Sequence, residues 1–190
     1  MSMEKPSTYS SAARHFHWWT VAFVAIQFPL GIAMTVRGSW LDIWDPLTNN
    51  MYSAHKLLGF ILFFVVAARL GYRLSHRVPQ DEPTLEAWQK VTSHVTHWAI
   101  YALLLLVPIL GWFGVQLFPA LDIFGWFDLP AVVSANKAAS AEVLGLHRLL
   151  AILLLFLLAV HVGAALFHYF IRKDGVLHRM LPGLPRRDGS

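Results

Sequence analysis

The segment LHRLLAILLLFLLAVH, residues 146–161, decides the fold class of this chain. Apart from two histidines and one arginine, it contains only leucine, isoleucine, valine, alanine and phenylalanine. It lies within a predicted span of residues 143–171, which exceeds the roughly 20 apolar residues that cross a hydrocarbon core. The segment therefore predicts a transmembrane helix. It also raises the question of why such a helix keeps a histidine near each end.

Three further apolar windows qualify as spans, at residues 17–36, 52–72 and 95–118. None of them alternates polar and apolar residues as the strands of a membrane barrel do. The whole chain is 56% hydrophobic and 14% charged, whereas soluble domains carry about 25% charged residues. The first run follows a polar N-terminus and lacks a small-residue cleavage site, so we expect it to be retained. The sequence predicts an all-α integral membrane four-helix bundle, with residues 1–190 as one domain.

Basic residues are unevenly distributed between the two sides that four spans define. Of the 15 Lys and Arg residues, 11 fall on the side of both termini and of the loop between spans two and three. The other side holds the remaining four, Arg37, Lys56, Lys137 and Arg148. The positive-inside rule therefore predicts cytoplasmic termini. Topology and anionic lipid account for the net charge of +4, so no nucleic-acid partner is expected.

The chain has no cysteine and 10 histidines. The lack of cysteine excludes disulfides, iron–sulfur clusters and thioether-linked haem. Any metal or cofactor must therefore be held by histidine, methionine or carboxylate. Polar residues within a span are costly and usually functional, which directs attention to the histidines of the spans.

Helical phase puts His147 and His161 on one face of span four. They are 14 residues apart, nearly four turns, and so about 21 Å apart along the axis. His168 is seven residues further on, close to the same face. One helix thus offers imidazoles to the bundle interior at different depths.

Histidines on other spans lie at matching depths. His55 begins span two on the side of His147, and His17 begins span one on the opposite side, towards His161. Neutral imidazoles on facing helices suit the axial positions of a b-type haem, so two haems are predicted, held by His55 with His147 and by His17 with His161. The second pair requires helix four to extend beyond the membrane. Three residues could replace His17: His15, His94 and His97.

A histidine-lined metal transporter is the rival interpretation of the same residues. A zinc or copper site would need carboxylates, or histidines clustered at one depth. The spans hold acidic residues only at their margins, Asp42 and Glu142. This pattern favours haem.

Four stretches of the chain resemble the bacterial cytochrome b561 family. They are RHFHWW, SAHKLLGFILFFVVAARLGYR, HVTHWAIYALLLLVPILGW and LHRLLAILLLFLLAVHVGAALFHYFIRKDGVLHRMLP. The resemblance covers nearly the whole chain and is weakest in the loop between spans three and four. HYF-x-x-KD and the closing RMLP are its more specific parts.

The resemblance implies a bacterial inner-membrane protein with two non-covalent b haems, whose iron is ligated by His17, His55, His147 and His161. It favours His17 over His15 and leaves His94 and His97 beside a ligand or a propionate. A member of the family that the chain resembles is a superoxide oxidase, which passes electrons from periplasmic superoxide to ubiquinone. Other four-helix cytochromes are haem-bearing anchor subunits for hydrogenases and dehydrogenases. A protein partner is therefore an alternative but not a requirement.

Two sets of polar residues would serve such an activity. Lys56 and Arg148 directly follow predicted ligands, where they could steer the superoxide anion or contact haem propionates. His168 and Arg14, with Trp98 as a wall, are candidates for contact with quinone or a propionate. The loop of residues 118–141 is expected either to lie on the membrane surface or to cap the bundle.

Overall fold

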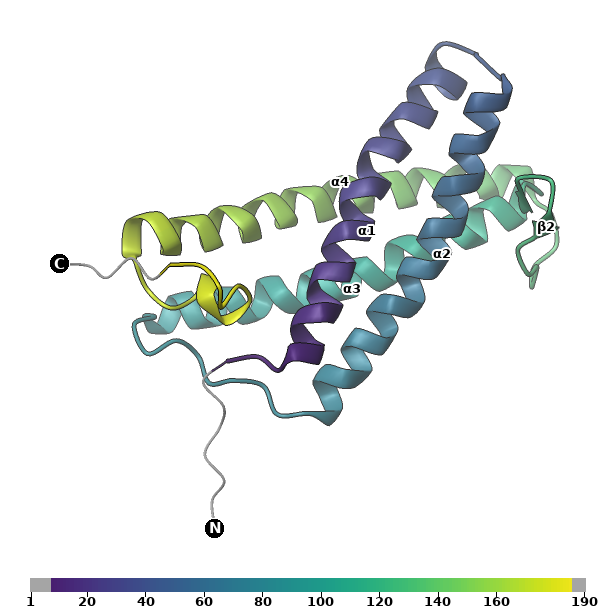
Figure 1. Cartoon of the computed structure of the whole chain (residues 1–190). Helices are drawn as coiled ribbons and strands as arrows, with labels where there is room; N and C mark the ends of the chain where they lie inside the picture. The colour runs from purple at the N-terminus through teal and green to yellow at the C-terminus, as the bar shows by residue number, and fades with distance from the viewer. Residues whose placement is uncertain (1–7, 186–190) are drawn as a thin grey trace.

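The computed structural model describes residues 8–185 and consists mainly of four long helices (Figure 1). These are α1 (Ser11–Thr35), α2 (Pro46–Ser75), α3 (Ala87–Leu117) and α4 (Lys137–Phe167). Two π-helical turns, Val36–Trp40 and His168–Arg172, extend α1 and α4, and a 3₁₀ turn, Leu177–Arg179, lies near the C-terminus. A small antiparallel hairpin joins β1 (Asp122–Ile123) to β2 (Phe127–Asp128). The predicted all-α bundle of four membrane-length helices is confirmed.

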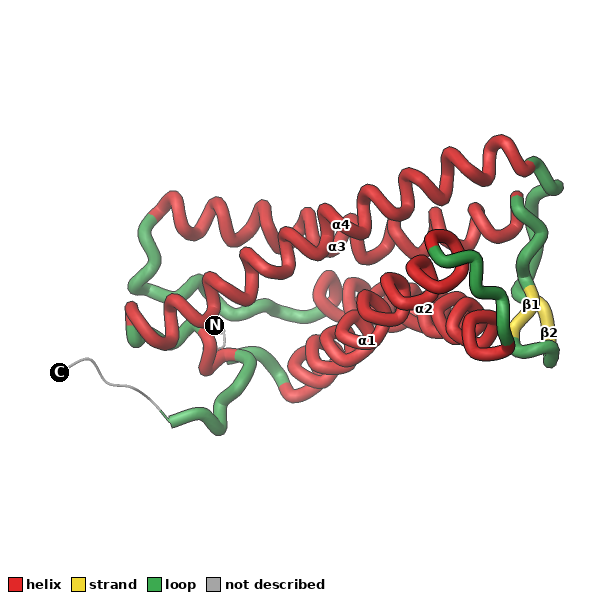
Figure 2. The backbone as a smooth tube through the Cα atoms, turned by 90° about the horizontal axis from the view of Figure 1, so that it is seen from above, coloured by secondary structure: helices red, strands yellow, loops and turns green. Residues whose placement is uncertain are grey.

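The helices form two antiparallel pairs, α1 with α2 and α3 with α4, which cross one another obliquely (Figures 1 and 2). One end of the bundle carries the loop of residues 118–136, and the opposite end carries residues 76–86 and 173–185. We call these the hairpin end and the strap end. Residues 173–185 are the strap.

The helices are longer than the predicted spans because polar caps, and not hydropathy, set their first residues. Asp45 caps α2 by accepting hydrogen bonds from the Thr48 backbone N–H and hydroxyl. Glu86 and Gln89 form a capping box, so α3 begins eight residues before the predicted span at 95. Asn136 caps α4 through Ala139 N. The residues that these caps add to each helix lie outside the apolar window of the predicted span.

The core lies midway along the bundle, where three helices meet. It is formed by buried side chains of α2, α3 and α4, namely Leu62, Val66, Ile100, Tyr101, Leu103, Leu104 and Leu154. Many other apolar side chains face outward, such as Leu149, Ile152 and Phe156 of α4. An apolar exterior of this kind is the surface that a lipid bilayer solvates.

The loop of residues 118–136 caps the hairpin end. Ile123 is fully buried, and the Phe124 N–H donates to Ser53 Oγ of α2. Trp112 Nε1 donates to Pro130 O, and the Val132 N–H donates to Gln116 Oε1 of α3. Of the two expectations for this loop, the structure therefore supports the cap.

Candidate haem sites

At the hairpin end, the rings of His55 on α2 and His147 on α4 lie next to each other. Their centroids are 6.2 Å apart, and the ring planes are nearly perpendicular, at 87°. Both residues are partly buried between the helix pairs. The structure therefore brings together the two histidines that depth and phase had paired.

Each ring of this pair packs against a glycine on the neighbouring helix. A Cβ atom added at Gly111 of α3 would lie 3.0 Å from His147 Cε1. One added at Gly31 of α1 would lie 3.1 Å from His55 Cε1. These approaches are closer than nearly all real Cβ contacts, so only glycine leaves both rings undisturbed. The two glycines form notches that hold the imidazoles close to the helix backbones.

The second nitrogen of His147 is oriented by the main chain. His147 Nδ1 is 2.8 Å from Val107 O, and because a carbonyl oxygen only accepts, Nδ1 carries the proton. Nε2 then keeps its lone pair, which is the form of imidazole that binds a metal. His55 is held through its backbone, since Gln27 Nε2 donates to His55 O at 3.0 Å, while His55 Nδ1 is buried without a partner among the described residues.

At the strap end, His17 of α1 and His161 of α4 face each other with ring centroids 6.4 Å apart. Helix α4 and its π-helical turn continue to Arg172, 11 residues past His161. His97 of α3 also contacts His161, at 5.2 Å between centroids. His94, in contrast, is exposed and pairs with Asp81. The other predicted substitute, His15, is exposed on α1.

A charged residue of α2 adjoins the strap-end pair. Arg69 Nη2 lies 3.0 Å from His17 Nδ1, and the guanidinium stands 5.2 Å from the centre of the Tyr101 ring. Since a guanidinium only donates, His17 Nδ1 accepts, and the ring proton then resides on Nε2. His147 at the hairpin end and His17 at the strap end are therefore held in different tautomers.

The two cations beside predicted ligands have different surroundings. Lys56 Nζ donates to Ala120 O at 2.8 Å and also to Asp122 O, so the ammonium anchors the capping loop. Arg148 is exposed and has no polar partner among the described residues. The structure thus distinguishes the two residues: the Lys56 ammonium is bound to the loop, and Arg148 is exposed.

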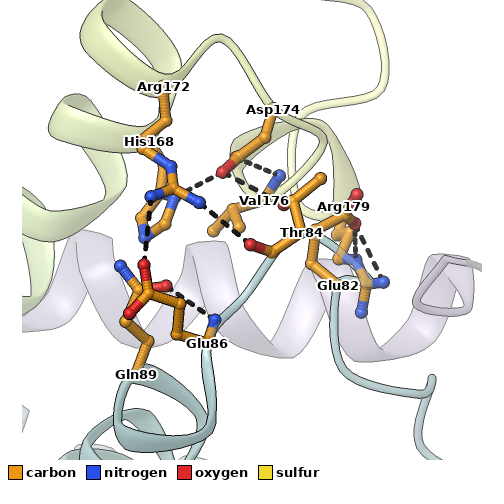
Figure 3. Close-up of polar contacts among 9 residues, drawn as sticks. All are labelled: Glu82, Thr84, Glu86, Gln89, His168, Arg172, Asp174, Val176 and Arg179. Atoms are coloured by element: carbon orange, nitrogen blue, oxygen red, sulfur yellow. Dashed lines mark hydrogen bonds and ion pairs between the residues drawn. The ribbon is translucent and has the colours of Figure 1, made fainter.

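The residues predicted near quinone lie at the strap end but do not form one cluster. His168 Nδ1 is 2.6 Å from Asp174 Oδ2, and the two side chains are only 12% and 4% exposed. Arg172 donates to Thr84 O beside them, and Arg179 pairs with Glu82 (Figure 3). The other two candidates lie elsewhere: Arg14 donates to Tyr9 O, and Trp98 lies under Arg73.

Sequence reasoning overlooked several residues that build these sites: Gln27, Gly31, Arg69, Arg73 and Gly111. A signal was available for Gln27 and Arg69, because each is a polar side chain inside an apolar span. Gly31 and Gly111 carried no such signal. A glycine in an apolar helix does not reveal which ring it faces.

Four apolar helices with a pair of facing histidines at each end define an integral membrane bundle suited to a buried planar cofactor. Comparisons with known proteins identify its family. The model of the family described as prokaryotic cytochrome b561 matches residues 8–183. This chain therefore belongs to the prokaryotic cytochrome b561 family, whose members are membrane electron-transfer proteins with haem b.

Individual relatives match over almost their whole length. Cytochrome b561 homolog 1 of Escherichia coli strain K12 is 30% identical over 178 residues, covering 92% of this chain and 97% of the relative. The probable superoxide oxidase CybB of Yersinia pestis is 26% identical, over 92% and 96%. Cytochrome b562 of Cereibacter sphaeroides is 28% identical, over 94% and 98%.

The residues of the chain fit haem b. The donor set consists of imidazoles on facing helices, and no cysteine is present for covalent attachment. Within residues 8–185, His55 Nδ1 and Gln27 Oε1 are buried polar atoms without partners, and the glycine notches bring helix backbone close to the imidazoles. Within residues 8–185, no three His, Asp or Glu side chains gather as a metal-ion cage would require. The family match favours haem over the transporter interpretation.

Proposed function

We propose that this protein holds two b-type haems, ligated by His55 with His147 and by His17 with His161, and carries electrons from superoxide to ubiquinone. One observation carries the ligand assignment: the ring centroids are 6.2 and 6.4 Å apart in the two pairs. A metal–imidazole bond of about 2.0 Å, with about 1.1 Å from nitrogen to ring centre, gives about 6.2 Å for two axial imidazoles. His97, at 5.2 Å from His161, is too close.

The charge distribution supports the orientation. The hairpin end lies on the side that holds four of the 15 basic residues, so it is assigned to the periplasm. The strap end, with both termini, is assigned to the cytoplasm of a bacterial inner membrane. Superoxide would then meet the hairpin end first. Arg148, exposed beside His147, is the cation available to attract it, whereas Lys56 positions the loop.

Bound haem would supply one-electron transfer. Two superoxide ions each give up one electron and leave as oxygen, and ubiquinone takes two electrons and two protons to become ubiquinol. The chain's own residues hold the imidazoles, keep water out of the apolar middle of the bundle, and handle protons at the strap end. His168 with Asp174 is the buried polar pair there that can move a proton towards a reduced quinone.

An absorbance spectrum of the purified protein tests the haem assignment. We expect a b-type difference band and two haems per chain. Alanine at His55 or His147 should remove one haem, alanine at His17 or His161 the other, and His15→Ala, two residues from His17, should keep both. Retention of both haems in His161→Ala would exclude the strap-end pair.

Reduction by superoxide tests the electron donor. A pulse of superoxide should reduce the haems of the isolated protein within the mixing time, and added ubiquinone should reoxidise them. Haems that remain oxidised under a superoxide flux would instead favour the alternative of an anchor subunit, which needs a partner dehydrogenase or hydrogenase. Superoxide dismutase in the same mixture is the control for the identity of the reductant.

A further inference from the structure

A basic pocket opens at the strap end between α1, α2 and α3. Three arginines from the last part of α2 and just beyond it line this pocket: Arg69, Arg73 and Arg77. The hydroxyl groups of Ser10, Tyr72 and Tyr101 also line it. Apolar residues such as Phe16 and Val78 complete the wall. A concave site with several cations and hydroxyl groups is suited to an oxyanion, either carboxylate or phosphate.

Two of these arginines have no carboxylate partner among the described residues. Arg73 stands over the rings of Trp98 and Tyr101, each at 5.7 Å, and Arg69 stands over Tyr101. The carboxylates of the strap end that lie within residues 8–185 are engaged elsewhere: Asp81 with His94, Glu82 with Arg179, Glu86 with Trp88 and Arg172, and Asp174 with His168. Charged groups inside a span normally pair, so an external anion is expected here.

The contact between Arg69 and His17 restricts what that anion can be. If His17 binds iron through Nε2, its ring proton must move to Nδ1, and two donors then face each other at 3.0 Å. Arg69 must consequently turn to another acceptor whenever His17 is a ligand. If the group that contains the iron also carries a hydrogen-bond acceptor, binding of that group to His17 would bring the acceptor to Arg69 as well.

We propose that Arg69 and Arg73 form the binding site for the propionate carboxylates of the haem that His17 and His161 hold. This inference rests on the proposed function. A guanidinium matches a carboxylate with two parallel hydrogen bonds, and Arg73 would remain stacked on Trp98 and Tyr101 while its N–H groups bind. A lipid phosphate could accept the same hydrogen bonds, but its binding would not be coupled to the binding of iron by His17.

Redox titration and resonance Raman spectroscopy of the haem-loaded protein in nanodiscs test this site. Arg69→Gln and Arg73→Gln each remove a positive charge that favours the reduced haem. We expect one of the two haems to become about tenfold harder to reduce, about 59 mV for a one-electron couple. The other haem, roughly 21 Å away, should shift much less because the Coulomb energy between two charges falls as their separation grows. The propionate bending band of the affected haem should shift.

Arg172→Gln is the matched control, since it removes the same charge at the same end from a guanidinium bound to Thr84 O. It should leave both the potentials and the propionate band unchanged. Arg69→Lys keeps the charge without the two-pronged geometry, so the potential should stay near that of the wild type while the band moves. If Arg69→Gln does not accumulate, Arg73→Gln provides the same two measurements.

Changing the lipid of the nanodiscs shows whether the arginines bind a haem propionate or a lipid phosphate. Potential shifts that occur in phosphatidylglycerol nanodiscs but vanish in pure phosphatidylcholine would assign the arginines to lipid phosphate and overturn the proposal. Two haems with unchanged potentials and an unchanged band in both glutamine variants would also overturn it. A protein without two b haems would refute the proposed function instead, so the two failures are distinguishable.

Discussion

Gly111 on α3 lies directly against the ring of His147 on α4, so closely that a Cβ atom would sit 3.0 Å from Cε1 and 3.1 Å from Nδ1. The same ring donates from Nδ1 to Val107 O, one turn earlier on α3. The hydrogen bond to Val107 O and the missing side chain at Gly111, both on α3, thus fix the orientation of this imidazole. The neighbouring helix determines how His147 presents Nε2.

A side chain at position 111 should therefore displace His147. We expect Gly111→Val to lower the haem content from two per chain towards one, because the ring must leave its notch. Gly145→Val is the control, since a Cβ atom at Gly145 of α4 meets nothing within 4 Å. Haem extraction and the difference spectrum give the stoichiometry. Two haems in Gly111→Val would show that the notch is dispensable.

Lys56 should stabilise the fold and not steer the substrate. Replacing it with methionine removes the hydrogen bonds to Ala120 O and Asp122 O, and hydrogen bonds to charged groups contribute about 1.5–3 kcal/mol. We expect a lower thermal midpoint for the detergent-solubilised Lys56→Met protein. Arg148→Met, which lacks such contacts, should melt like the wild type. Equal midpoints for all three proteins would contradict the anchoring role.

Arg148 should affect the rate of encounter with superoxide. We expect Arg148→Met to slow haem reduction about threefold at low ionic strength, since a cation at the surface mainly changes the association rate. The difference should fade at about 1 M salt, where the Debye length falls to about 3 Å. Stopped-flow or pulse reduction at several salt concentrations measures both effects. A slower rate that does not depend on salt would point to a structural defect.

His168 should act after the haems are reduced. With His168→Gln, we expect reduction by superoxide to proceed normally, while reoxidation by ubiquinone slows at least tenfold because the buried proton donor is lost. Asp174→Asn should behave similarly, since it removes the negative charge of the carboxylate that accepts from His168 Nδ1 at 2.6 Å. Haem reduction by superoxide and haem reoxidation by ubiquinone are measured separately. Reoxidation of the His168→Gln protein at the wild-type rate would exclude His168 as the proton donor.

Asp45 should make the start of α2 sensitive to acid. The pKa of its carboxyl is lowered by the backbone N–H of Thr48 first, and then by the Thr48 hydroxyl and Arg37. A folded-state pKa below the ordinary value of about 3.9 stabilises the fold above that pH, and this contribution is lost as the pH falls through the folded-state pKa. Asp45→Asn keeps a capping residue but removes the charge. Its melting temperature should lie below that of the wild type at pH 7, and the two should converge in acid.

The sequence predicted what a helix determines by itself. Four apolar windows gave the spans, and a regular helix of 3.6 residues per turn was enough to place His147 and His161 on one face. The structure pairs both with the expected partners. Helix ends were less predictable, because Asp45 and the Glu86–Gln89 capping box act through local hydrogen bonds that hydropathy does not register.

Contacts between distant segments could not be predicted. Lys56 donates to Ala120 O, 64 residues away, and no sequence pattern in either segment predicts that contact. The contact of Arg69 with His17 depends on the crossing of the helix pairs. The same holds for Gly111 beside His147. Helical phase shows which face a residue lies on, but tertiary packing decides what it meets there.

The strap bears on how molecules reach the strap end of the bundle. Trp18 Nε1 of α1 donates to Met180 O, and Arg179 binds Glu82, so the strap is tied both to α1 and to the segment that precedes α3. Beside His168, in contrast, Phe167, Phe170 and Ile171 present exposed apolar surface. A carrier dissolved in the bilayer thus has an apolar surface along which it can approach His168. The fold would in this way favour electron transfer to an acceptor that is itself dissolved in the membrane.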